Sequence, residues 1–185
     1  HPDQLLVERV QNGDKRAFDL LVKKYQHRVI AVVSRFVRDP DEAMDVTQDA
    51  FLKAYRALAN FRGESAFYTW IYRIAVNTAK NYLVSRGRRP PDSDIDVGEA
   101  EQFASSEALH EFASPEQEMM KDQLEKVVFD ALRDLPDDLR TAVTLREFDG
   151  LSYEEIAEVM DCPVGTVRSR IFRGREAIDK KIEMM

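Results

Sequence analysis

The sequence predicts an all-α protein made of two small helical domains joined by a flexible acidic linker. Seven glycines and seven prolines are few for 185 residues, and no segment alternates apolar and polar side chains for long, so strands are not expected. Instead, apolar residues recur at steps of three and four along most of the chain. We place the first domain at residues 1–90, the linker at 91–114 and the second domain at 115–185.

The first domain is expected to hold four helices, whose ends are marked by capping and helix-stopping residues. Their expected ranges are up to Gly13, from Asp14 to Asp39, from about Asp41 to Leu58, and from Ser65 or Thr69 to about Ser85. The third helix has an apolar stripe that predicts its inner face as Met44, Thr47, Phe51, Ala54, Tyr55 and Leu58.

The second domain begins with a capping signal at Ser114, and Pro136 should end the helix that follows. After a further helix over about 137–148, Ser152 and Glu155 form an S-x-x-E capping box, which predicts another helix start. Pro163 suits the first position of a last helix, where its missing N–H costs nothing. A short helix, a tight turn and a second helix is the helix-turn-helix pattern.

The last helix carries arginines without a nearby acid in its own sequence. Four of them precede Glu176, namely Arg168, Arg170, Arg173 and Arg175. In a helix-turn-helix this second helix enters the major groove, where an arginine fork pairs with the acceptors of a guanine edge. The alternative is a solvated basic face on an ordinary helical hairpin. The capping box and the placed proline favour DNA binding.

The fourth helix opens with an unusual density of aromatic residues between Phe67 and Tyr72. Behind them Arg73, Asn77 and Lys80 follow at steps of three and four on one face. Rings that stack on bases, cations that track phosphates and amides that read base edges suit single-stranded DNA. Trp70 fits this role and a place in the core equally well.

A charged face on the third helix has two interpretations. Asp45, Gln48, Asp49 and Lys53 lie away from its predicted inner face. They form either a solvated surface or a docking surface for a basic partner.

Composition excludes several other classes of protein. The single Cys162 rules out an internal disulfide or a multi-cysteine zinc site, and the three histidines are scattered, so we expect no metal and no cofactor. No apolar run approaches the roughly 20 residues that span a bilayer, and no signal peptide is visible. The net charge of −7 comes from residues 92–122, which hold ten acids and one base and leave +2 for the rest. Local patches, not this total, decide DNA affinity.

These motifs together resemble the extracytoplasmic-function sigma factors of bacterial RNA polymerase, and look closest to the sigma-E/AlgU envelope-stress branch. The resemblance spans nearly the whole chain. It is carried by the segments DVTQDAF at 45–51, FRGESAFYTW at 61–70, RIAVN at 73–77 and CPVGTVRSR at 162–170.

The resemblance implies sigma region 2 in the first domain, region 4 in the second, and a role for each motif. Core polymerase would bind Asp45, Gln48 and Asp49. A pocket for a flipped base of the −10 promoter element would be formed by Lys53, Ala57, Phe61, Ile74, Ala75 and Asn77. The −35 element would be read by Arg168, Ser169, Phe172, Arg173 and Arg175. Gly174, where relatives usually carry alanine, is a departure that should leave recognition intact.

The resemblance also implies the partners and the location. The partners are core RNA polymerase, through its beta-prime clamp helices and beta flap, promoter DNA, and a membrane-anchored anti-sigma factor. The protein would be cytoplasmic, without inserting into the membrane itself, and held at the inner membrane by that factor when inactive. Without an inhibitor over its binding faces, such a factor should be active by default.

Two other classes of protein are less consistent with the sequence. A transcription activator would need a sensor or dimerisation domain in place of the aromatic helix, and none is visible. An enzyme would need a catalytic constellation, and no carboxylate pair lies with a histidine or a glycine-rich phosphate loop. We therefore expect a specificity subunit of RNA polymerase without a catalytic site of its own.

Overall fold

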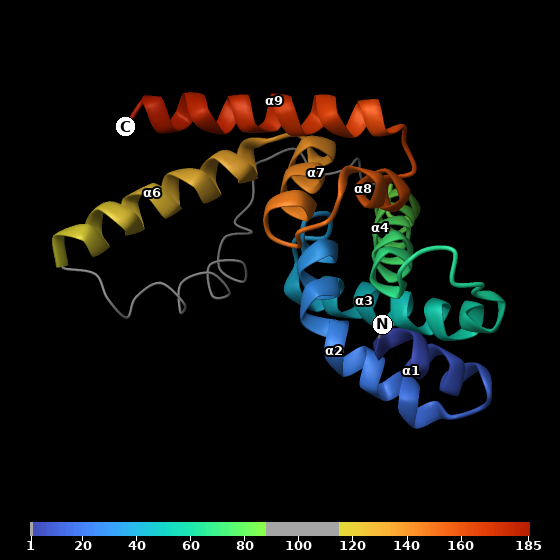
Figure 1. Ribbon diagram of the computed structural model, residues 1–185. Coiled ribbons are helices and arrows are strands. Elements are labelled where there is room, and N and C mark those ends of the chain that lie inside the picture. Colours follow the sequence, from blue (N-terminus) through green and yellow to red (C-terminus); the bar gives the residue numbers. More distant parts are fainter. Residues whose placement is uncertain (1, 88–114) are drawn as a thin grey trace.

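The computed structural model describes residues 2–87 and 115–185, and within them every regular element is a helix (Figure 1). This confirms the all-helical prediction. The helices are α1 (Pro2–Gln11), α2 (Lys15–Ser34), α3 (Pro40–Ala57), the 3-10 helix η1 (Leu58–Asn60), α4 (Phe67–Ser85), α6 (Pro115–Asp134), α7 (Asp137–Glu147), α8 (Tyr153–Met160) and α9 (Val164–Glu183). The predicted linker at 91–114 and the predicted cap at Ser114 lie outside the described residues.

Side-chain caps fix several helix starts where the sequence predicts them. The Asp14 carboxylate accepts a hydrogen bond from the N–H of Arg16 at 3.1 Å, and Asp39 caps α3 in the same way. In the capping box the Ser152 hydroxyl accepts from the N–H of Glu155 at 3.1 Å, while the Glu155 carboxylate accepts from the N–H of Ser152 at 2.9 Å. These bonds satisfy donors that the first turn of a helix leaves free.

Two predicted helix starts are wrong. Helix α4 follows Ala66, which makes no side-chain cap, and Thr69 is buried within the first turn. The hydroxyl of Thr69 is used elsewhere, because it donates to Glu155 of α8 at 3.2 Å. Pro163 is the N-cap of α9 with extended backbone, one position before the first helical residue.

The inner face of α3 differs in part from the predicted stripe. Met44 is 48% exposed and Tyr55 37% exposed, so neither faces the core as predicted. Ala43, Val46 and Ala50 are buried in their place. Alanines add little to a hydrophobic pattern, whereas the large side chains of Met44 and Tyr55 dominate it. The predicted inner face is therefore displaced toward Met44 and Tyr55.

In the C-terminal half, α9 lies across α6 and α7 (Figure 1). Leu132, Leu135 and Val143 form a small separate core there. The buried Gly174 gives α9 its close approach to α7, because a Cβ added at this glycine would lie 2.5 Å from Cγ2 of Val143.

This close approach changes the expected effect of restoring alanine at position 174. A helical alanine is worth about 1 kcal/mol over glycine, but overpacking against a stiff β-branched neighbour costs about 1–3 kcal/mol. We therefore expect Gly174→Ala to lower the free energy of unfolding in urea denaturation, by about 1 kcal/mol net.

A double-mutant cycle checks this cause. In the Val143→Ala background the same substitution should become neutral or stabilising, since the methyl group that it meets is gone. Equal effects of Gly174→Ala in both backgrounds would show that Val143 does not restrict this site.

The two halves of the chain pack against each other through α4 and α8 (Figure 1). Buried residues of both halves form one continuous apolar core. At its edge the Arg35 guanidinium, at the end of α2, lies 3.3 Å from the carboxylate of Asp149, which follows α7. Their side chains are 3% and 8% exposed, so this ion pair is buried between the halves.

Candidate nucleic-acid interface

One face of α9 is exposed and basic. Arg168, Ser169, Phe172 and Arg173 all project to solvent, and their spacing places them on one side of the helix. Phe172 is 68% exposed, which is unusual for a large apolar ring. Arginine forks beside an apolar ring can pair with guanine edges and contact thymine methyl groups.

The Arg175 side chain is already paired with an acid, which the sequence does not suggest. Its Nε lies 2.9 Å from Oε1 of Glu147, and a second guanidinium nitrogen also bonds that carboxylate. The hydrogen bond raises the pKa of Arg175. To contact DNA, Arg175 would have to exchange this acid for the nucleic acid.

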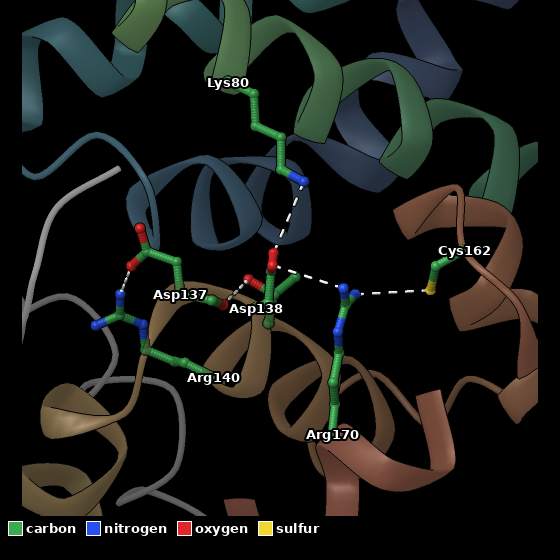
Figure 2. A network of polar contacts seen from close by, with 7 residues as sticks. Lys80, Asp137, Asp138, Arg140, Cys162 and Arg170 are labelled. Atoms are coloured by element: carbon green, nitrogen blue, oxygen red, sulfur yellow. Dashed lines mark hydrogen bonds and ion pairs between the residues drawn. The ribbon is translucent and has the colours of Figure 1, made fainter. Parts of the chain in front are cut away.

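Arg170 does not share the exposed face. Its guanidinium lies 3.6 Å from the carboxylate of Asp138 on α7 and 3.6 Å from the Cys162 sulfur (Figure 2). Arg170 and Arg175 therefore do have nearby acids, contrary to expectation, because Asp138 and Glu147 come from another helix, α7.

Tyr153 is a residue of this surface that the sequence analysis missed. The guanidinium of Arg168 lies 5.9 Å from the centre of its ring and that of Arg146 lies 4.9 Å from it. Such cation–π contacts restrict long, flexible side chains, so Tyr153 helps to position Arg168. The sequence signal was an aromatic residue directly after the capping Ser152.

On α4 the structure places the predicted −10 residues at several depths. Arg73 and Asn77 are exposed, and Ile74 and Lys80 are half-buried. Ala75 is 0% exposed and belongs to the core, so its side chain offers no surface for a base in this structure.

Phe61 and Trp70 lie together at the end of this face. Their ring centres are 4.9 Å apart, and both rings are partly buried against the core. Trp70 thus packs against the core and keeps part of its ring accessible. Its position is therefore compatible both with a role in the core and with stacking on a base.

Helix α3 carries the remaining predicted residues at its surface. Asp45, Gln48, Asp49, Lys53 and Ala57 are all exposed. The Lys53 ammonium lies 3.3 Å from the carboxylate of Asp49 one turn earlier. Asp45, Asp49 and Lys53 also line a groove between α3 and α4, so the proposed core-binding acids and one edge of the proposed base pocket are adjacent.

Within residues 2–87 and 115–185 no cluster of His, Cys, Asp or Glu has the arrangement of a metal site. Across the same residues, no helix combines the length and the apolar character needed to cross a membrane.

Family models match both halves of the chain. Residues 21–89 match sigma-70 region 2 and residues 126–178 match sigma-70 region 4. The RNA polymerase sigma-H factor of Pseudomonas aeruginosa is 66% identical over 181 residues, which cover 98% of this chain and 94% of the relative. The ECF RNA polymerase sigma-E factor of Escherichia coli K12 is 65% identical with the same coverage. The chain belongs to the extracytoplasmic-function (ECF) sigma factors.

Two solved structures are also similar. CnrH in complex with the cytosolic domain of CnrY covers 100% of this chain and 99% of that one, with a TM-score of 0.66 and 24% identity, and shares the fold. An engineered region 2 of sigmaE in complex with GTAAAA is 63% identical, covers 47% of this chain and 90% of that one, and gives a TM-score of 0.44. Sigma factors are DNA-binding specificity subunits of RNA polymerase and not catalysts, which confirms the expectation that this chain is not an enzyme.

Proposed function

We propose that this chain binds core RNA polymerase and directs it to promoters whose −35 element it reads as duplex and whose −10 element it captures as a single strand. The observation that supports this most is the pairing of two different DNA-type surfaces in one chain. One is the exposed basic face of α9, and the other is the row of aromatic, cationic and amide side chains on α4. We assign region 2 to residues 1–90 and region 4 to 115–185.

The face of α9 suits the −35 duplex. Arg168 and Arg173 have the donors for guanine edges, Phe172 has the apolar surface for a thymine methyl group, and Ser169 suits a phosphate or a base edge. Arg175 joins this set once it leaves Glu147.

The α4 face suits an unpaired −10 strand. Asn77 has donors and an acceptor for the edge of a flipped base, and Phe61 and Trp70 present ring surface for stacking. Arg73, Lys80 and Lys53 provide charge for the phosphates, while Ile74 and Ala57 form the apolar wall. Ala75 supports this wall from the core.

We assign the binding of core polymerase to three exposed residues of α3, because the resemblance places Asp45, Gln48 and Asp49 against its clamp helices. Asp49→Arg should weaken association with core polymerase by about tenfold or more, because a like charge placed in a charged interface costs several kcal/mol. Gel filtration of the mixture and a titration of labelled polymerase measure it.

The control is Asp19→Arg, an equal charge change at an exposed position of α2. Both variants should keep the helical circular dichroism of the parent, since both side chains are exposed. Normal core affinity of a folded Asp49→Arg variant would leave this face as a merely solvated surface.

The regulation and the location complete the proposal. We assign a cytoplasmic location, an envelope-stress role and a membrane-anchored anti-sigma factor that covers the two regions. Amphipathic helices of such a partner suit the apolar side chains that α3 exposes, among them Leu52 and Tyr55. The anti-sigma segment should therefore compete with core polymerase, and a stable ternary complex of the three would contradict this occlusion.

A further inference from the structure

Helix α1 lies against the turn that carries Phe61, and one of its side chains bonds this turn at two points. The side-chain amide nitrogen of Gln11 donates to the backbone carbonyl of Leu58 at 3.0 Å and to that of Phe61 at 2.9 Å. An amide NH₂ group has two hydrogens, so both are used on the same turn. The partners lie 47 and 50 positions from Gln11, which makes this a contact between distant segments.

The turn has few hydrogen bonds of its own. The helix η1 is a single 3-10 turn of three residues, and the N–H of Phe61 closes it by donating to the carbonyl of Leu58 at 3.1 Å. Hydrogen bonds of this kind have poorer geometry than those of an α-helix. Residues 61–66 belong to no helix, so Gln11 gives the Phe61 carbonyl the hydrogen bond that a helix would otherwise supply.

Helix α1 is itself fixed, although it lies near the start of the chain. The side chain of Asp3 is buried, and its carboxylate lies 2.6 Å from the Lys24 ammonium of α2. The Tyr25 hydroxyl donates to the same carboxylate. In the middle of the helix Val7 is 1% exposed. Chain ends fray unless they are held in this way, so Gln11 projects from a fixed support.

The position of the turn decides where the Phe61 ring lies. The centre of this ring is 4.9 Å from that of Trp70 on α4, and Trp70 lies 5.8 Å from the ring of Phe67. Phe61 reaches α4 from a non-helical segment, so a change in the backbone at 58–61 would carry its ring away from Trp70. Binding sites need their contact groups held within about 0.5 Å of the productive geometry.

We propose that Gln11 is a positioning residue of the −10 site, which fixes the Phe61 ring against Trp70 before the strand binds. The inference rests on the −10 assignment above. Gln11 contacts no base in this account and acts only through Phe61. Because the turn is already ordered by α1, the strand does not have to order it on binding, and this raises the affinity.

The test variant is Gln11→Leu, which removes both donors and nearly keeps the size of the side chain. Gln11 is exposed at the end of α1, so we expect the variant to fold, and thermal melting by circular dichroism checks this. The matched control is Gln123→Leu, the same change at an exposed position of α6. Phe61→Ala and the double variant Gln11→Leu/Phe61→Ala complete a double-mutant cycle.

The first measurement is the fluorescence of Trp70, the only tryptophan of the chain. In the full chain without DNA, Gln11→Leu should shift the emission to longer wavelength and increase quenching by acrylamide. Both changes should go in the direction of Phe61→Ala, because the Trp70 ring loses its cover, while Gln123→Leu should match the parent. Unchanged Trp70 fluorescence in a folded Gln11→Leu variant would show that Gln11 does not position Phe61.

The second measurement is the anisotropy of the labelled single strand GTAAAA with the polymerase holoenzyme. Gln11→Leu should bind the strand about fivefold more weakly, since two hydrogen bonds that order the turn are lost. Phe61→Ala should lose about tenfold or more, as expected for one stacked ring. The double variant should bind no more weakly than Phe61→Ala alone. A further loss in the double variant, as large as in the parent, would contradict action through Phe61.

Two other results separate this proposal from the −10 assignment on which it rests. Weak strand binding by Phe61→Ala with normal binding by Gln11→Leu overturns the positioning role and leaves the −10 assignment intact. Normal strand binding by both variants, with altered Trp70 fluorescence, means that Phe61 contacts no base. The −10 assignment of Phe61 is then wrong, and the positioning role of Gln11 falls with it.

Discussion

Asn77→Ala should slow promoter opening by about 10- to 100-fold, which corresponds to the roughly 1–3 kcal/mol that one captured base contributes. The side chain is exposed on α4, so its removal should change neither the fold nor the affinity for core polymerase. Stopped-flow fluorescence of a probe in the −10 region measures the opening rate. Phe61→Ala should act in the same direction, but it also removes a ring packed on Trp70.

Two controls separate capture of the base from general damage. Asn12→Ala changes another exposed amide, just after α1, and should leave opening unchanged. A promoter with a pre-melted −10 segment should rescue part of the defect of Asn77→Ala, because the cost of unpairing has already been met. Normal opening by both Asn77→Ala and Phe61→Ala would show that no base is captured at this site.

Arg168→Ala and Arg173→Ala should each weaken binding to −35 duplex by about 1–3 kcal/mol and relax specificity at the base that each one reads. Arg175→Ala should lose less, because Arg175 must give up its bond to Glu147 before it binds DNA. Electrophoretic mobility shift with matched and scrambled −35 sequences measures both quantities, using the polymerase holoenzyme.

Variants of Arg170 and Lys180, two other cations of α9, serve as comparisons for the −35 prediction. Lys180→Ala, at the exposed far end of α9, should have little effect on specificity. Arg170→Ala should act mainly through the packing of α9 on Asp138. If Arg168→Ala weakens matched and scrambled DNA equally, Arg168 is a phosphate contact and does not read sequence.

The helix caps and helix ends that depend on neighbouring residues could be predicted from the sequence. The capping box at Ser152 and Glu155, the cap at Asp14 and the helix end before Pro136 depend on residues within a few positions of one another. The spacing of the apolar residues predicted the helices, because the side chains that a helix buries recur with the helical repeat. Motif resemblance gave the family and the division into two DNA-binding regions.

Contacts between segments that are distant in the sequence could not be predicted from it. Glu147 and Arg175 are 28 positions apart, and Tyr68 and Glu155 are 87 apart. Neither pair has a local sequence signature, because it depends on how complete helices pack. For the same reason the sequence did not show that Lys80 faces Asp138, or that Gly174 meets Val143.

Run-off transcription with purified core polymerase tests the central claim, that this chain selects promoters, most directly. The template carries a sigma-E-type promoter, and a matched template has its −35 and −10 elements scrambled. With the chain added, core polymerase should produce the full-length transcript from the first template alone, and Asn77→Ala should reduce its yield. No transcript above that of core polymerase alone, or equal transcription from both templates, would contradict the claim.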